Sequence, residues 1–196
     1  MLILVLAALL AEGRPLFYWG ARPPVVSVAA EPRAGDEAAV TEVHAALDKG
    51  SLVLRFTFDR PVREAIFLPD GSPVSGRLRA VVYLDLDDDR STGADLGPLD
   101  LRTGAERRLE VGVLSIGEDA EERREAAAAI TATLAALSPH ARRRTLWRGD
   151  DTATPRRVSA RGEWVEVKLP PDPAIRPGTR IVLAEGGRAS GGRLRP

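Results

Sequence analysis

The residues best suited to chemistry are Asp85, Asp87 and Asp89, three aspartates at alternate positions. They end a run in which apolar residues alternate with others, which is the periodicity of a β-strand. Side chains two positions apart lie on the same side of a strand, so at least the first two carboxylates project from one face. Like charges this close repel one another, and calcium is a hard cation that binds several carboxylate oxygens in loose geometry. The spacing therefore predicts a structural calcium site.

Two further carboxylates are candidate ligands for this metal. The turn-forming residues 91–93 follow the cluster and would bend the chain back over it, which brings Asp95 towards the site. Glu110 lies on the non-core side of the next strong strand pattern, so it would face the same site if the two strands are neighbours. The competing interpretation is a solvated acidic turn whose charge is balanced by nearby arginines.

The acidic loop does not match an EF-hand. That motif requires glycine where this chain has Arg90, a glutamate at about the twelfth position, and flanking helices. Here a strand pattern precedes the loop and no glutamate stands at that distance. The Asp-x-Asp-x-Asp spacing still directs several oxygens towards one point, so the calcium prediction rests on a strand-borne loop.

A metal-dependent hydrolase is the enzymatic alternative. An apolar strand followed by Asp-x-Asp resembles the start of haloacid-dehalogenase phosphatases, which would make Asp85 a nucleophile and Asp87 an acid/base. Asp150 and Asp151 resemble the later acidic pair of those enzymes, but neither lysine of this chain lies between the two acidic motifs. The chain also has no Gly-x-Ser-x-Gly motif and no glycine-rich phosphate loop. We therefore expect a protein that is not an enzyme.

Two tryptophans suggest a second alternative, a carbohydrate-binding module. Trp147 and Trp164 both fall in strand-like segments and would stack on sugar rings if they shared an exposed face. Only 5% of the residues are aromatic, and a tryptophan on a sandwich strand more often packs against its neighbours. Whether these two side chains share an exposed face distinguishes a carbohydrate-binding module from a domain in which each tryptophan packs against its neighbours.

Many short segments with strand periodicity lie on both sides of the acidic residues in the sequence. Residues 40–47 and 52–58 form two alternating runs joined by a glycine-containing turn, which is a hairpin signal. Residues 118–137 depart from the strand pattern. Acidic residues in the first turns are followed by alanines and by apolar residues at helical spacing, which predicts a helix. The pattern predicts a mainly β protein, an antiparallel β-sandwich of jelly-roll or immunoglobulin-like type with one inserted α-helix.

Composition limits the number of domains and the partners. The 196 residues suit one well-buried core, and 28 basic residues balance 28 acidic ones, so no overall field favours nucleic acid. Without cysteine, the chain has no disulfide, thiol nucleophile or cysteine-ligated zinc. The oligomeric state is not determined by these features.

The N-terminal apolar run points to export. Residues 2–11 are uncharged and apolar, fewer than the ~20 needed to span a bilayer. They match the apolar region of a signal peptide cleaved between Glu12 and Pro15, although no basic residue precedes them. An uncleaved short anchor and a buried first element are the alternatives. We expect a periplasmic, cell-surface or secreted protein with no membrane span beyond this segment.

Four segments follow from these patterns. Residues 1–13 are the signal peptide or anchor, 14–35 a linker with a first strand, 36–185 the β-sandwich domain, and 186–196 a flexible basic tail.

Four stretches carry a resemblance to a known group. DEAAVTEVHAALDKGSLVLRFTF, VVYLDLDDDRSTGADLG, ERRLEVGVL and RGEWVEVKLP resemble exported bacterial β-sandwich domains related to family 9 carbohydrate-binding modules and DOMON-like domains. The resemblance implies a calcium ion held structurally by Asp85, Asp87 and Asp89. The chain departs from the group in the pattern at 118–137, and Met1 as the sole methionine excludes the Met/His pair of haem-binding members. We expect a non-catalytic exported domain that recognises a carbohydrate or another envelope component.

Overall fold

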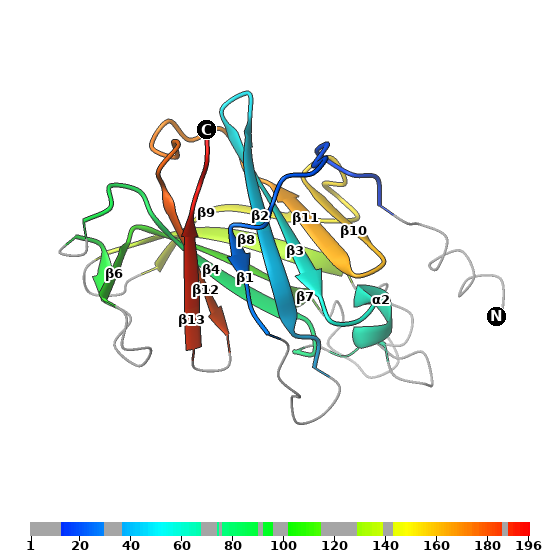
Figure 1. The fold of residues 1–196 in the computed structure, drawn as a ribbon. Helices are drawn as coiled ribbons and strands as arrows, with labels where there is room; N and C mark the ends of the chain where they lie inside the picture. The colour runs from blue at the N-terminus through cyan, green and yellow to red at the C-terminus, as the bar shows by residue number, and fades with distance from the viewer. Residues whose placement is uncertain are drawn as a thin grey trace, which may run out of the picture.

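Two antiparallel β-sheets pack face to face as a sandwich in the computed structural model of the chain (Figure 1). The structure describes residues 13–29, 37–67, 74, 76–89, 92–95, 102–114, 129–138, 143–185 and 188–196. The mainly β sandwich predicted from the strand patterns is therefore confirmed.

One sheet has five strands and the other has six. The five-stranded sheet has the order β1-β2-β3-β11-β10. Its strands are β1 Val26–Ser27, β2 Val40–Asp48, β3 Ser51–Phe58, β10 Val158–Arg161 and β11 Trp164–Lys168. The six-stranded sheet has the order β13-β12-β4-β7-β8-β9. Its strands are β4 Arg79–Asp85, β7 Arg107–Leu114, β8 Ala129–Leu137, β9 Arg143–Asp150, β12 Arg180–Glu185 and β13 Arg188–Arg193. A small third sheet pairs β5 Ala94–Asp95 with β6 Arg102–Ala105.

The core lies between the inner faces of the two large sheets. Alternate residues of the central strands are buried there, because strand side chains alternate between the two sides of a sheet. Burial of these large apolar side chains supplies most of the stabilising free energy of such a fold. The largest buried side chains from β3, β4, β7 and β11 are Leu52, Leu54, Phe56, Phe58, Val82, Leu84, Leu109, Val111, Val165 and Val167.

The helix predicted over 118–137 is wrong for the part that the structure describes. Residues 129–137 form β8, which pairs with β7 on one side and β9 on the other. Ile130 and Leu134 lie an even number of positions apart, so the spacing that fits a helical stripe also puts both on the inner face of a strand. Pairing with two neighbouring strands outweighs the local helix propensity of the alanines. Residues 118–128 lie outside the described part of the chain.

The described helix is short and lies elsewhere. It is α2 Val62–Ala65, a single turn after β3 in which Val62 and Ala65 are buried against the core. No helix among the described residues is long and apolar enough to cross a membrane.

The described residues of the predicted linker and tail, 14–29 and 188–196, are packed on the two sheets. Residues 13–22 cross the outer face of the five-stranded sheet before β1 pairs with β2. Residues 188–193, predicted as part of a flexible tail, form β13 paired with β12, and Leu194 is buried in the core. Glycine-rich sequence is compatible with a strand here because Gly192 allows the close approach of Val25.

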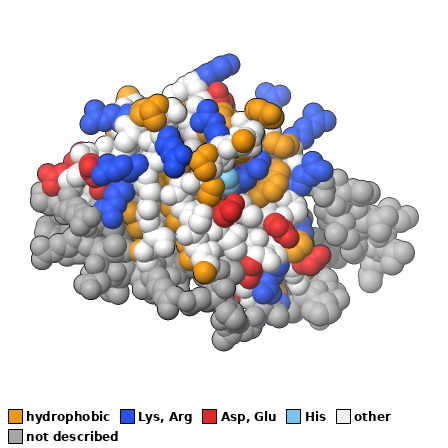
Figure 2. Space-filling view, in the orientation of Figure 1, with side chains coloured by type: hydrophobic (Ala, Val, Ile, Leu, Met, Phe, Trp, Pro, Cys, Tyr) orange, Lys and Arg blue, Asp and Glu red, His pale blue; other side chains and the backbone are white. Residues whose placement is uncertain are grey.

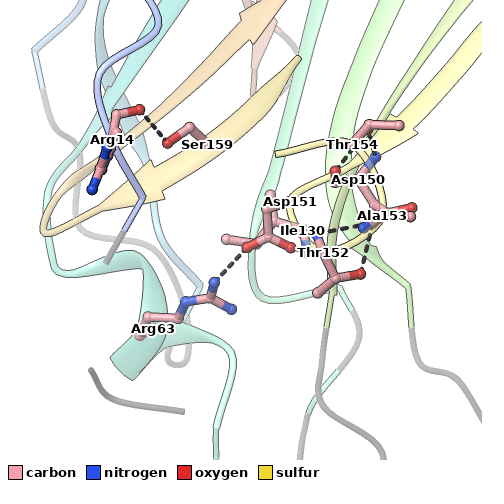
Figure 3. A network of polar contacts seen from close by, with 9 residues as sticks. All are labelled: Arg14, Arg63, Ile130, Asp150, Asp151, Thr152, Ala153, Thr154 and Ser159. Carbon is pink, nitrogen blue, oxygen red and sulfur yellow. Dashed lines mark hydrogen bonds and ion pairs between the residues drawn. The ribbon is translucent and has the colours of Figure 1, made fainter. Parts of the chain in front are cut away.

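Polar contacts hold the turn that leads from β9 to β10 (Figure 3). The Asp150 carboxylate accepts hydrogen bonds from the backbone N–H groups of Thr152 and Ala153, which forms an Asx turn. Asp151 accepts from the Ile130 backbone N–H at 2.9 Å and forms an ion pair with Arg63. Asp151 therefore ties the turn to both β8 and α2.

Candidate metal centre

The acidic cluster lies where β4 ends beside the start of β7. Asp85 is the last residue of β4, and the register pairs Leu84 with Arg107 across the sheet. Just before β7, the Glu106 backbone N–H donates to the Leu84 carbonyl at 3.0 Å. This contact continues the pairing by one residue, so Glu106 lies opposite Asp85 on the outer side of the sheet.

Asp85 is the most unusual carboxylate of the described chain. Its side chain is fully buried, and its Oδ1 accepts a hydrogen bond from the Asp88 backbone N–H at 2.7 Å. Its Oδ2 is buried and has no hydrogen-bond partner among the described residues. Burial raises the pKa of Asp85, and the nearby charges of Glu106, Asp88 and Asp87 add to this effect. A buried carboxylate oxygen without a partner is costly unless a cation neutralises it.

Thr92 connects the other carboxylates of the cluster. Its Oγ1 lies 3.0 Å from Asp87 Oδ2, 3.0 Å from Glu106 Oε1 and 2.9 Å from the Asp89 carbonyl oxygen. A hydroxyl group carries a single proton and can donate to one of these oxygens at a time. Acceptors therefore outnumber donors at this point, and the surplus oxygen lone pairs can bind a cation.

The loop conformation follows from two backbone positions. Asp88 has φ of 63°, a left-handed conformation that aspartate tolerates better than most residues. Gly93 has φ of 69°, and a Cβ there would lie 2.4 Å from the Gly104 carbonyl oxygen. Only glycine therefore fits where the loop passes β6, and this passage returns Thr92 to the carboxylates.

Asp88 itself has another partner. Both of its carboxylate oxygens lie 2.7 Å from the Arg193 guanidinium of β13. This pair fixes the loop to the C-terminal hairpin and leaves Asp85 and Asp87 as the loop carboxylates that face Glu106.

The predicted ligands fall into two groups in the structure. Asp85 and Asp87 contribute to one cluster with Glu106, whose ligand oxygens all lie within 4.8 Å of one another. Asp89 is exposed and donates its backbone N–H to Asp87 Oδ1, while its carbonyl faces Thr92. Asp95 lies in β5 opposite Arg102.

Glu110 lies away from the cluster, on the same face of β7. It is opposite Val81 rather than Asp85, and it pairs with Arg108 at 2.6 Å and Arg79 at 2.9 Å. Burial alone would raise the pKa of Glu110, but hydrogen bonds from Arg108 and Arg79 outweigh it and lower this pKa.

Glu106 and Thr92 are the site residues that sequence reasoning missed. Glu106 has the same parity as Glu110, so the strand pattern placed both on one face of the same segment. Only the register of β7 against β4 selects between them.

The two tryptophans do not form a common platform. Trp147 lies in β9 of the six-stranded sheet and packs against the core. Trp164 lies in β11 of the five-stranded sheet, where the Arg55 guanidinium sits 4.9 Å from its ring centroid. Their positions in different sheets give no support to a sugar-stacking surface built from both.

The acidic cluster could hold a metal ion. Calcium binds six to eight oxygens at about 2.3–2.6 Å, so ligands on opposite sides of the ion are about 5 Å apart. One oxygen from each of the three carboxylates lies within 4.8 Å of the others, and the Asp89 carbonyl and Thr92 hydroxyl lie beside them. Magnesium requires shorter distances of about 2.0–2.1 Å and near-octahedral geometry.

Comparisons of the chain with protein-family models, with curated proteins and with solved structures found no match.

Proposed function

We propose that this protein is a non-catalytic β-sandwich domain that binds one calcium ion structurally. The observation that carries the proposal is the buried Asp85 Oδ2, which has no partner within the described structure and belongs to a three-carboxylate cluster. Asp85, Asp87 and Glu106 would supply carboxylate ligands, and the Asp89 carbonyl and Thr92 hydroxyl would complete the protein's share. The ion would neutralise the cluster and hold the loop against the start of β7.

A structural role is favoured over a catalytic one by the surroundings of the cluster. Apart from Asp85 Oδ2, the carboxylate oxygens of the cluster also accept hydrogen bonds from backbone N–H groups and from Thr92, so the cluster holds the loop in place. A hydrolytic site would need a general base beside an open coordination position. The described histidine, His44, lies in β2 of the other sheet and contacts Glu42 and Trp19.

The cellular role that fits best is recognition outside the cytoplasm. The apolar residues 2–11 support export, and the motifs quoted above resemble exported domains of the carbohydrate-binding and DOMON-like groups. The partner we propose is a carbohydrate or another envelope component. Fractionation of the natural host tests export, because intact chain in the soluble cytosolic fraction would contradict it.

Thermal unfolding with and without calcium tests the metal proposal. An ion that binds only the folded state stabilises it by about 2.7 kcal/mol at 100 times its dissociation constant. Calcium should raise the Tm, magnesium should raise it less, and a chelator should reverse the gain. Asp87→Asn should remove most of the calcium response and leave the metal-free protein no less stable, because it also relieves repulsion. If the Tm of the unmodified protein is indifferent to calcium, the proposal is wrong.

A further inference from the structure

We propose that β9, at one edge of the six-stranded sheet, binds an acidic and extended segment of a partner protein, which adds to the sheet as a further strand. The inference goes beyond the proposed function, because it names a protein segment as the partner and does not depend on calcium. It rests on the open backbone edge of β9 and on the arginines that β9 presents to solvent.

β9 is the edge strand that stays open in the described structure. At the opposite edge of the same sheet, β13 lies beside β1, where Gly192 allows the close approach of Val25. In the five-stranded sheet, the Ala160 carbonyl of β10 accepts a hydrogen bond from the Gly13 N–H at 2.9 Å. Within the described part of the chain, residues 143–149 form backbone hydrogen bonds with β8 alone. An edge of this kind is a template on which another strand can pair.

The direction of the free backbone groups follows from the turn after β9. The Asp151 N–H donates to the Ile130 carbonyl of β8 at 3.0 Å, whereas the N–H and the carbonyl of Asp150 both bond to Thr154. Backbone groups of successive residues in an extended strand point to opposite sides. The N–H and the carbonyl of Arg148 therefore point away from β8, towards the open edge.

The side chains of this edge are basic. Arg143, Arg144 and Arg148 are exposed, and among the described residues their guanidinium groups pair with no carboxylate. Arg148 Nε lies 3.4 Å from the Thr133 hydroxyl oxygen. Residues 143–161 contain six arginines and two aspartates, although the whole chain has no net charge. Both aspartates are engaged in the turn shown in Figure 3, so the positive charge of β9 is not balanced locally.

The five-stranded sheet has a mixed surface instead. Figure 2 shows acidic and basic side chains intermixed on the side of the molecule that Figure 1 turns towards the reader. On this sheet Arg55 pairs with Glu166, and Lys168 pairs with Asp48. Charges there are compensated within the protein, which distinguishes that face from β9.

An acidic extended segment matches both features of β9. Its backbone would pair with the open edge, and its carboxylates would lie beside the arginines. Leu146, which is 40% exposed and has no partner in β8, adds an apolar contact. A second copy of the chain fits less well, because it would bring two arginine-rich strands together. A glycan or a nucleic acid would neutralise the arginines but has no backbone that continues the hydrogen bonding of a sheet.

A peptide of alternating glutamate and threonine, equal in length to β9, tests the proposal. Hydrogen exchange followed by NMR in the presence of chelator should show slower exchange of the Arg148 amide when the peptide is added. The amides of β13, at the other edge of the sheet, should not change. The same peptide with every backbone amide N-methylated keeps its charge but has no N–H donor, and it should give no protection. Equal effects of the two peptides would indicate attraction of any anion, glycans and nucleic acids included, and would overturn the proposal, as would unchanged exchange in β9.

Charge reversal on β9 provides the second test. Arg143→Glu with Arg148→Glu should weaken peptide binding at least about fivefold, because attractive cross-strand pairs become repulsive ones. The same variant should bind a peptide with lysine at the glutamate positions better than the unmodified protein does, which shows that the edge is still folded.

Arg176→Glu with Arg195→Glu is the matched control, because it makes the same charge change at exposed positions outside β9. This control should bind the acidic peptide as the unmodified protein does, and an equal loss in both double variants would overturn the proposal. Binding is measured in chelator, so a failure of the calcium proposal would leave these results unchanged.

Discussion

Glu106 lies beside Asp85 where β4 ends and β7 begins, and their oxygens are within 4.8 Å of each other. The two residues are 21 positions apart in the chain and share no local motif. Their proximity depends on the pairing of β7 with β4 and on the Glu106 N–H to Leu84 carbonyl bond at 3.0 Å. The pairing at the end of β4 thus brings two carboxylates together, and their negative charges repel each other unless a cation binds between them.

Glu106→Gln should remove most of the rise in Tm that calcium produces, because it neutralises one of three carboxylates in the cluster. Glu110→Gln is the matched control on the same face of β7, and it should preserve the calcium response while losing the ion pairs with Arg79 and Arg108. Differential scanning fluorimetry across a calcium titration measures both. The reverse result, with the response dependent on Glu110, would show that the register of β7 is wrong.

Asp85→Asn should stabilise the metal-free protein at neutral pH. The substitution removes a fully buried charge whose Oδ2 has no described partner, and leaving such a group buried costs about 1–3 kcal/mol. The same variant should lose the calcium response. Urea unfolding in chelator gives the free energy. A destabilised metal-free variant would mean that the carboxylate charge is already compensated.

Phe56→Ala should lower the free energy of unfolding by about 3–5 kcal/mol, because Phe56 is fully buried between the sheets. Thr57→Ala, at the next position on the opposite side of β3, is a control expected to cost much less. Chemical denaturation measures both. Similar costs for the two would contradict the assignment of Phe56 to the inner face.

Acid should weaken the contribution of Asp150 to stability. Hydrogen bonds from the Ala153 backbone N–H and then from Thr152 lower the pKa of Asp150 in the folded protein. A carboxylate with a lowered pKa stabilises the fold above its unfolded value of about 3.9, and the contribution is lost as pH falls through the folded value. Asp150→Asn should therefore lower the Tm at pH 6 and differ less from the unmodified protein at pH 2. A Tm difference that does not shrink in acid would contradict this assignment.

Glu166→Gln should weaken the packing of residues 13–22 on the five-stranded sheet, because the Leu16 N–H and the Trp19 Nε1–H both donate to the Glu166 carboxylate. The change removes the fully buried negative charge that pairs with the partly exposed Arg55, and breaking a buried pair costs about 3–5 kcal/mol. Glu163→Gln, exposed near the start of β11, should be close to neutral. Equilibrium unfolding compares the two variants. If Glu166→Gln is equally neutral, Glu166 does not hold residues 13–22 in place.

Local patterns in the sequence predicted the sandwich and half of the site. Alternation along 52–58 and 78–86 is a property of neighbouring residues, because side-chain direction in a strand reverses at each step. The same alternation placed Asp85 and Asp87 at a strand end and Leu54, Phe56 and Leu84 inside, as the structure has them. These features need no knowledge of which strands pair.

The register of paired strands and the pairing of distant segments determined which residues join the cluster and where the remaining strands form. Glu106 and Glu110 have the same parity in one segment, and only the alignment of β7 with β4 puts Glu106 at the cluster and Glu110 opposite Val81. Residues 129–137 have a helix-forming composition, yet hydrogen bonds to β7 and β9 make them a strand. Residues 188–193 read as a glycine-rich tail and become β13 because β12 offers a free edge. Backbone pairing between distant segments leaves little trace in local composition, so tertiary structure alone determines it.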